Sequence, residues 1–205
     1  RRSSDLYLLN YFKKKYQSKT TNNVFSPNLF LSIQYFFPGS NLGFSAGCNI
    51  GYKLLKSEKP DFLFFVNNDA MLAKNCLLEL IDNHNENMVK DRILSPNILT
   101  TNGKGTWFDG GIYNSILGYS SHVPYAVFKR KANKYLSGCA LFMPTEVFLG
   151  LKGFNENYFF YGEDLDLSIR ASKKGILLDV CKSAIAYHDG GGSIVKKTRK
   201  AYFYY

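Results

Sequence analysis

The sequence predicts an α/β fold in which helices cover a mostly parallel central sheet. Short apolar runs alternate with amphipathic stretches, as they do where helices connect the strands of such a sheet. The run Phe-Leu-Phe-Phe-Val at 62–66 is apolar on both faces, which suits a central strand covered by helices. The chain has 205 residues, 45% of them hydrophobic, which is enough for one domain with a sizeable core. We therefore expect a single domain over residues 1–205.

The first half of the chain is expected to add three helices to that strand. The first covers residues 6–16, with Ser4 or Asp5 as its N-cap, and the second covers 44–56. A third helix over 75–87 has an apolar side formed by Leu77, Leu78 and Ile81.

The second half continues the alternation. Residues 95–134 are rich in Gly, Asn and Tyr, so we expect irregular loops with short strands there. A strand over 135–143 and a helix over 164–174 follow. The helix begins with acidic residues, ends with two lysines as its dipole prefers, and is stopped by Gly175. Residues 176–187 are expected to supply one or two further strands.

The formal net charge of +10 favours anionic partners such as acidic lipid headgroups or a diphosphate. The charge is dispersed in short clusters at 13–15, 129–131 and 196–200, and no nucleic-acid motif accompanies it, so we expect no nucleic-acid partner. The last cluster adjoins the aromatic run 202–205, a pairing that can sit at a membrane surface. No apolar run approaches the ~20 residues that span a bilayer. We expect a cytoplasmic protein that is either soluble or peripheral at an anionic membrane surface.

Four widely spaced cysteines contain no Cys-x-x-Cys pair: Cys48, Cys76, Cys139 and Cys181. This spacing argues against a zinc ribbon and against a disulfide scaffold. We expect reduced, mostly buried thiols.

Asn67-Asn68-Asp69 follows the apolar strand directly. Ligands collect at the carboxyl ends of strands in open α/β sheets, so a carboxylate meets a ligand there. An aspartate oxygen at this position can hold Mg²⁺ or Mn²⁺, and such an ion neutralises a departing diphosphate. The same tripeptide is also good turn chemistry, so alone it does not separate a turn from a metal site.

Three acidic residues, Glu163, Asp164 and Asp166, gather at the start of the helix over 164–174. Capping needs one or two, and the segment before them is unusually aromatic. A carboxylate in such surroundings can have a raised pKa and act as a general base, whereas a helix N-terminus lowers the pKa. Asp166 and Arg170 stand i, i+4 and are expected to form a structural ion pair.

Two glycine-containing segments are further candidates. His188 ends the last predicted strand before three glycines at 190–192 that let backbone approach a ligand, and it is equally well explained as a ligand or as a structural histidine. Residues 41–51 place glycines at a helix entrance, where N–H groups can meet an anion. The segment has neither the Walker nor the dinucleotide-binding spacing.

Together and in this order, these segments resemble the large family 2 of inverting glycosyltransferases, in particular its bacterial rhamnosyltransferase-like members. The resemblance runs from about Ser3 to Ser193. The matching pieces are Asn-Leu-Gly-Phe-x-x-Gly-x-Asn at 41–49, the strand with Asn-Asn-Asp at 62–69, Trp-Phe-Asp-Gly-Gly at 107–111, Ser-Gly-Cys-Ala at 137–140, Gly-Phe-Asn-Glu at 153–156, Glu-Asp-Leu-Asp-Leu at 163–167 with Arg170, and His188.

The resemblance implies a Rossmann-like glycosyltransferase A domain and a metal-dependent hexosyltransferase of cell-envelope polysaccharide biosynthesis. It implies transfer from a nucleotide-diphosphate sugar to a glycan or lipid-linked acceptor, with inversion, at the inner face of a bacterial plasma membrane. Asn67 replaces the family's usual first acid, which weakens the expectation of tight metal binding. The family's first strand and base-binding acid are not found, so we expect a catalytic domain truncated at both ends.

The resemblance also assigns roles to individual residues. Asp164 would deprotonate the acceptor hydroxyl, with Glu163 beside it, and Asp69 and His188 would hold Mg²⁺ or Mn²⁺. The donor-binding residues would be Asn41, Gly43, Asn49, Asn67 and Asn68, and the acceptor-binding residues Trp107, Gly138 and Cys139.

Two alternatives stay open. One is a non-catalytic, glycosyltransferase-like binding protein, against which the joint presence of Asp69, Asp164 and His188 argues. The other is a nucleotidyltransferase on a related fold, which would carry a Gly-rich, Arg- or Lys-bearing signature near its start.

Overall fold

The computed structural model describes residues 24–26, 29–31 and 38–189, which fall into two units, Arg1–Asn41 and Leu42–Tyr205. In the first unit, β1 (Val24–Ser26) and β2 (Leu29–Leu31) form an antiparallel pair. The helix expected over 6–16 and the basic and aromatic residues at 196–205 lie outside the described residues.

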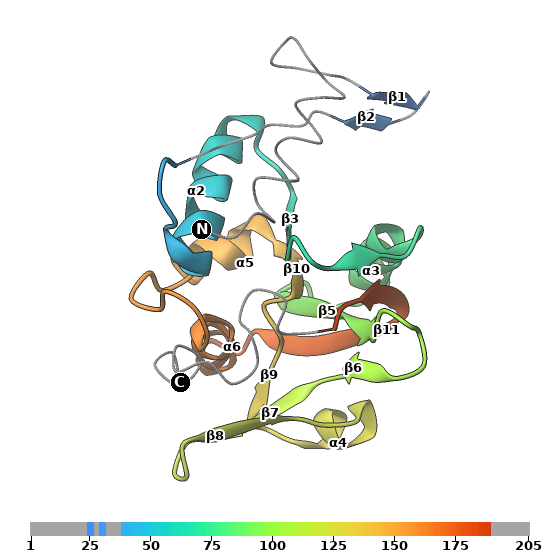
Figure 1. The fold of residues 1–205 in the computed structure, drawn as a ribbon, viewed down its shortest axis with the longest axis vertical. Helices are drawn as coiled ribbons and strands as arrows, with labels where there is room; N and C mark the ends of the chain where they lie inside the picture. Colours follow the sequence, from blue (N-terminus) through green and yellow to red (C-terminus); the bar gives the residue numbers. More distant parts are fainter. Residues whose placement is uncertain (1–23, 27–28, 32–37, 190–205) are drawn as a thin grey trace. The chain divides into compact units, whose positions relative to one another are not determined.

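The second unit is built on a six-stranded sheet (Figure 1). The order along the sheet is β3-β10-β5-β11-β4, and β6 pairs with β5 beyond that path. The strands are β3 (Phe62–Val66), β4 (Met71–Leu72), β5 (Arg92–Leu99), β6 (Thr106–Phe108), β10 (Ala140–Pro144) and β11 (Leu177–Tyr187). Strands were expected at 62–66 and 176–187, and both are confirmed.

The sheet is mixed, which corrects the expectation of a mostly parallel one. β5 and β11 pair in parallel, whereas the other pairs in the sheet are antiparallel. After β5 the chain does not cross over through a helix. It turns at 100–105 into β6 and returns as β10, which is inserted between β3 and β5 in the opposite direction.

Helices cover both faces of the sheet. Alternating residues of β5 and β10 point to opposite sides, so that Leu94 and Phe142 pack with α3, while Ile93 and Leu141 join the larger core under α5 and α6. The helices are α2 (Gly43–Leu55), α3 (Cys76–Glu86), α4 (Tyr125–Arg130), α5 (Thr145–Gly150) and α6 (Glu163–Lys173), with a 3₁₀ turn η1 (Lys56–Glu58). None of the described helices is long and apolar enough to cross a bilayer.

The region expected to be irregular, 95–134, is more ordered than its composition indicates. It begins within β5, a strand buried at seven of its eight positions. Pro96 lies in this strand, although proline has no N–H to donate to a ladder. Its partner is Cys181, where the register of β11 shifts, so the missing donor falls at an irregularity of the sheet.

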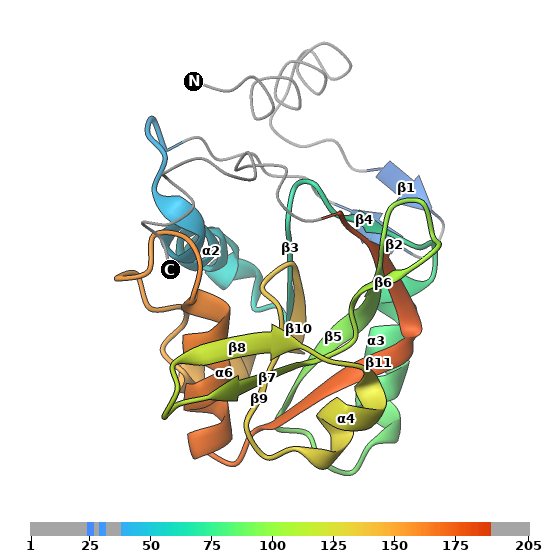
Figure 2. The same cartoon turned by 60° about the horizontal axis from the view of Figure 1, so that its bottom comes forward.

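A second, three-stranded sheet of order β8-β7-β9 follows, with β7 (Gly111–Asn114), β8 (Tyr119–His122) and β9 (Lys134–Tyr135). Figure 2 shows this small sheet with α4 beside it. The single strand expected over 135–143 is therefore wrong. A turn at 136–139 breaks it into β9 and β10, which belong to different sheets.

The buried face of α3 matches the expected one only in part, because Ile81 packs against the core but Leu77 and Leu78 do not. Cys76, Leu80 and His84 are buried at i, i+4 and i+8, whereas Leu77 and Leu78 are 44% and 61% exposed. Periodicity does not separate two neighbouring stripes of one helix, and the position of the sheet selects between them.

Candidate active site

Asp69 and His188 lie together although 119 residues separate them in sequence. The reason is strand pairing, because β4 pairs with the last residues of β11 and brings the loop after β3 to the end of β11. Nε2 of His188 lies 3.1 Å from Oδ1 of Asp69, the distance of an imidazole N–H donating to a carboxylate. The backbone N–H of His188 donates to the carbonyl of Leu99 at 2.8 Å, and Trp107 packs edge-on against the ring at 4.4 Å between centroids.

This pair fits part of a divalent-metal site. A carboxylate oxygen and an imidazole nitrogen are both ligands of Mn²⁺-type ions, and an ion would replace the proton that they share. The side chain of Asp69 is 37% exposed, so its carboxylate is reachable from solvent, whereas the His188 side chain is buried. The described residues contain no group of three or more His, Cys, Asp or Glu side chains that could hold a metal.

The turn 136–139 connects this pair with the acidic start of α6. On one side, the N–H of Asn67 donates to the carbonyl of Cys139 at 2.9 Å. On the other, the N–H of Gly138 donates to Oδ2 of Asp164 at 2.9 Å. A Cβ on Gly138 would lie 3.3 Å from Cβ of Asp164, so glycine permits this close approach.

The Cys139 side chain is buried, and burial, reinforced by the charge of Asp69, raises the pKa of its thiol to about 12. If Cys139 contacts the sugar acceptor, the contact would therefore be made by the Cys139 backbone and not by its buried thiol. The four cysteines are free, as expected.

Asp164 is held by two backbone donors, Gly138 at Oδ2 and Leu165 at Oδ1, the latter at 2.8 Å. Burial raises the pKa of Asp164, and these two N–H groups act in the opposite direction. The residues before it, Tyr161 and Gly162, both have positive φ, of 69° and 88°. This strained entry turns the first residues of α6 toward the turn at 136–139.

Glu163 is 6% exposed, and its Oε2 has no hydrogen-bond partner among the described residues. Burial, with the neighbouring charge of Asp164 adding to it, raises the pKa of Glu163 from 4.5 to about 7. This carboxyl is therefore largely protonated near pH 6 in the folded protein.

Replacing Glu163 by Gln is expected to flatten the pH dependence of stability. Between pH 4.5 and 7 the unfolded chain loses the Glu163 proton while the folded state keeps it, so the wild-type protein loses stability as pH rises through this window. Glu163→Gln should gain on the order of 3 kcal/mol relative to wild type between pH 4.5 and pH 8. Urea unfolding at both pH values measures this, with the exposed Glu86→Gln as control. A difference between wild type and variant that is equal at both pH values would contradict a neutral Glu163.

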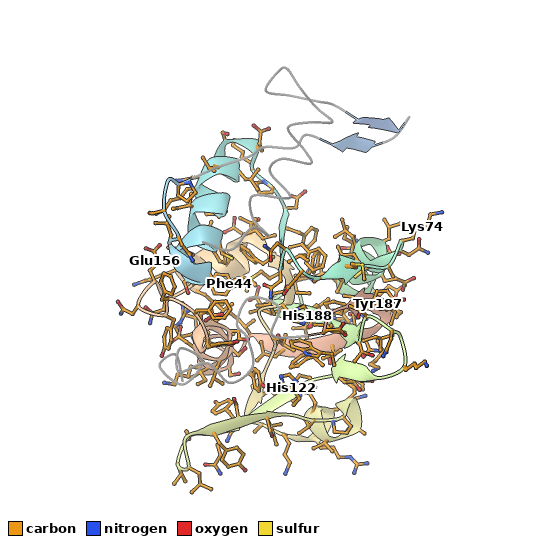
Figure 3. The ribbon with its side chains drawn as sticks, viewed as in Figure 1. Phe44, Lys74, His122, Glu156, Tyr187 and His188 are labelled. Carbon is orange, nitrogen blue, oxygen red and sulfur yellow. The ribbon has the colours of Figure 1, made fainter. Side chains whose placement is uncertain are left out.

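His122 is a site residue that the sequence did not indicate. Its Nδ1 lies 3.1 Å from the carbonyl of Trp107, its ring packs edge-on against Trp107 at 5.3 Å, and its charge is one of the influences that lower the pKa of Asp164. It is the last residue of β8, in a region expected to be irregular. In Figure 3, Phe44 of α2, His122 and His188 surround the same central region.

Comparison with known proteins supports a relationship at low identity. No protein-family model matches the chain. It is 26% identical over 161 residues to the low-salt glycan biosynthesis hexosyltransferase Agl10 of Haloferax volcanii, covering 77% of this chain and 52% of that protein. It is 27% identical over 176 residues to uncharacterized proteins of Mycobacterium tuberculosis and Mycobacterium bovis, covering 81% of this chain and 59% of theirs. The chain thus spans a little over half the length of these relatives.

Among solved structures, the chain is similar to GalNAc-T7 with UDP, GalNAc and Mn²⁺. The TM-score is 0.62 at 15% identity, and the match covers 92% of this chain and 35% of the other. The domain has a glycosyltransferase A fold. The predicted α/β class and glycosyltransferase A fold are thereby confirmed, whereas the sheet is mixed rather than mostly parallel.

Within this glycosyltransferase A fold, Gly43 and Asn49 allow α2 to pack closely against the loop before α6. Gly43 has φ 80°, and a Cβ there would lie 2.3 Å from the carbonyl oxygen of Phe159. The amide of Asn49 donates to the carbonyl of Phe154 and to Oε1 of Glu156, and its oxygen accepts the N–H of Phe154. Both residues thus have a structural function, and their donor-binding role stays a prediction.

The other predicted donor residues differ in exposure. Asn67 is half-buried and its carbonyl closes a turn with the N–H of Ala70, whereas Asn68 is exposed. Asn41 is exposed and belongs to the first unit. Their donor contacts stay predictions.

The segment Trp-Phe-Asp-Gly-Gly contributes mainly to packing. Asp109 accepts the N–H of Tyr125 at the start of α4 and pairs with Lys182. A Cβ on Gly110 or Gly111 would come within 2.5 or 2.2 Å of a neighbouring aromatic ring, so both positions require glycine. Trp107 is the member of this segment that contacts His188.

Proposed function

We propose that the chain is the catalytic domain of an inverting glycosyltransferase that moves a sugar from a nucleotide-diphosphate sugar to a glycan or lipid-linked acceptor. The observation that carries the proposal is the junction of Asp69–His188 with Asp164 through the turn 136–139. The Asp69–His188 pair suits a metal ion and a diphosphate, and Asp164 offers a general base. The similarity to Agl10, a glycan biosynthesis hexosyltransferase, and to GalNAc-T7, whose structure contains UDP and Mn²⁺, supports the same class.

The residues suggest a single displacement. Mg²⁺ or Mn²⁺ held by Asp69 and His188 would neutralise the charge of the diphosphate as it leaves. Asp164 would accept the proton of the acceptor hydroxyl while that oxygen attacks the anomeric carbon from the face opposite the diphosphate. The new carbon–oxygen bond forms as the bond to the diphosphate breaks, which inverts the configuration.

We further propose the finer features that the family 2 resemblance implies. These are a rhamnosyltransferase-like role in cell-envelope polysaccharide synthesis and a peripheral position on the inner face of the bacterial plasma membrane. The catalytic domain would be part of a longer protein.

A donor screen tests the proposed class. UDP-, dTDP- and GDP-sugars are incubated with the full natural chain and Mn²⁺, and thermal shift and donor hydrolysis are measured. We expect one nucleotide class to raise the Tm only when Mn²⁺ is present, since a ligand at 100 times its Kd stabilises by ~2.7 kcal/mol. Binding without hydrolysis or transfer would favour the non-catalytic binding protein. Release of pyrophosphate from a nucleoside triphosphate and a sugar phosphate would favour the nucleotidyltransferase.

A further inference from the structure

The hairpin between β7 and β8 ends in a tip, residues 115–118, that exposes two adjacent aliphatic side chains. Ile116 is 92% and Leu117 is 70% exposed, and Tyr119 just after the tip is 51% exposed. Single exposed apolar residues are normal on a protein surface, whereas two aliphatic residues side by side at the end of a hairpin can enter another apolar phase together.

The tip is held in one conformation. Oδ1 of Asn114 accepts the N–H groups of Ile116 and Leu117 at 3.0 and 2.9 Å, and the N–H of Gly118 donates to the carbonyl of Asn114 at 2.9 Å. Gly118 has φ 65°, which favours glycine. Because folding already fixes the tip, binding through Ile116 and Leu117 loses little further conformational entropy.

The stretch of chain that contains the hairpin and α4 carries basic charged residues only. No Asp or Glu occurs between Asp109 and Glu146, whereas this interval contains four basic residues, Lys129, Arg130, Lys131 and Lys134. The first three are exposed at the end of α4. Figures 1 and 2 both show α4 and the β7–β8 hairpin at the same face of the second unit.

These observations favour one partner over the others. Two copies meeting through this face would bring like charges together, and a soluble anionic glycan would leave Ile116 and Leu117 without an apolar contact. An anionic bilayer provides acidic headgroups for the lysines and arginine and an acyl region for the tip. We propose that this face docks on an anionic membrane, with Ile116 and Leu117 inserted and residues 129–131 against the headgroups. The proposal rests on the membrane-associated acceptor of the proposed function.

Vesicle flotation of the full natural chain tests it, with phosphatidylcholine vesicles that contain or lack ~30 mol% phosphatidylglycerol. We expect binding to the anionic vesicles and at least ~tenfold weaker binding for Ile116→Ser/Leu117→Ser and for Lys129→Gln/Arg130→Gln/Lys131→Gln. The matched control is Met88→Ser/Val89→Ser, because these residues are 97% and 49% exposed in the loop between α3 and β5. The control should bind like the parent.

Equal vesicle binding by the tip variant and the parent overturns the proposal. Parent binding that does not depend on phosphatidylglycerol overturns it as well. A tip variant that keeps vesicle binding but changes from dimer to monomer in sedimentation would instead identify a contact between copies. Loss of binding confined to replacement of residues 196–200 would place the membrane contact there and overturn the hairpin contact. Donor hydrolysis without vesicles is measured in parallel, so a failure of the glycosyltransferase proposal is distinguishable from a failure of the docking surface.

Discussion

Asp164→Asn is expected to lower the rate of sugar transfer by about 10²–10⁴-fold, the usual contribution of a general base. The amide cannot accept the acceptor proton at the pH of the reaction. It also keeps one acceptor oxygen where the carboxylate uses two, so one of the N–H groups of Gly138 and Leu165 would face an NH₂ group. We therefore expect a moderate loss of stability as well. Transfer rate, donor affinity and Tm of the full natural chain are measured together.

Asp166→Asn is the matched control, two residues further along the same helix. Asp166 pairs with Nε of Arg170 at 2.7 Å, and Arg170 also donates to the carbonyl of Leu151, so this variant should lose stability rather than turnover. Donor affinity should be retained in both variants. Transfer by Asp164→Asn within a few-fold of the parent would move the base elsewhere, and an unfolded Asp164→Asn would leave the residue a structural cap.

Asp69→Asn and His188→Gln are expected to remove metal-dependent turnover. A metal that stabilises a departing diphosphate contributes several kcal/mol, which corresponds to about 10²–10³-fold in rate. Asn and Gln keep the size and some hydrogen bonding of the native side chains, so the hydrogen-bonded junction between the two strand ends should persist. Mn²⁺ affinity is measured by electron paramagnetic resonance of the free ion with the donor nucleotide present, and turnover is followed in parallel.

Asp82→Asn serves as the control for charge, because Asp82 is an exposed carboxylate on α3 and is not one of the proposed ligands. It should bind Mn²⁺ like the parent. Unchanged Mn²⁺ affinity in Asp69→Asn, or parent activity that survives a chelator, would make the Asp69–His188 contact a purely structural hydrogen bond.

Several elements of the fold could be predicted from local patterns. β3 at Phe62–Val66 has the predicted bounds, and α2 and α6 begin and end within one residue of theirs. Each of these segments has a strong local signal, either an unbroken apolar run or an amphipathic repeat with charges or a glycine at its end. The ion pair of Asp166 with Arg170 was likewise predictable, because its i, i+4 spacing fixes the contact within one helix.

Other features required the tertiary structure. Pro96 and its polar neighbours Ser95 and Asn97 interrupt the apolar pattern of β5, so the sequence did not predict a strand there. The segment is a strand because β10 and β11 pair with it on either side. The buried stripe of α3 depends on where the sheet lies, and the division of 135–143 depends on two sheets that share the segment. His122 joins the site through Trp107, a contact that has no signature in the sequence around it.

Some features of the candidate site were likewise predictable from local sequence, and others required the tertiary structure. The sequence determined which residue types stand at strand ends and at a helix start, because those signals are local: Asn67-Asn68-Asp69, Glu163-Asp164 and His188. The family resemblance already implied that Asp69 and His188 lie together, and their 3.1 Å contact agrees with it. Only the tertiary structure decided that the pairing of β4 with β11 brings them together across 119 residues and that Gly138 joins this pair to Asp164. The physical reason is that hydrogen-bond pairing between distant strands, and the close approach permitted by a missing side chain, depend on positions in space rather than on the order of neighbours in the chain.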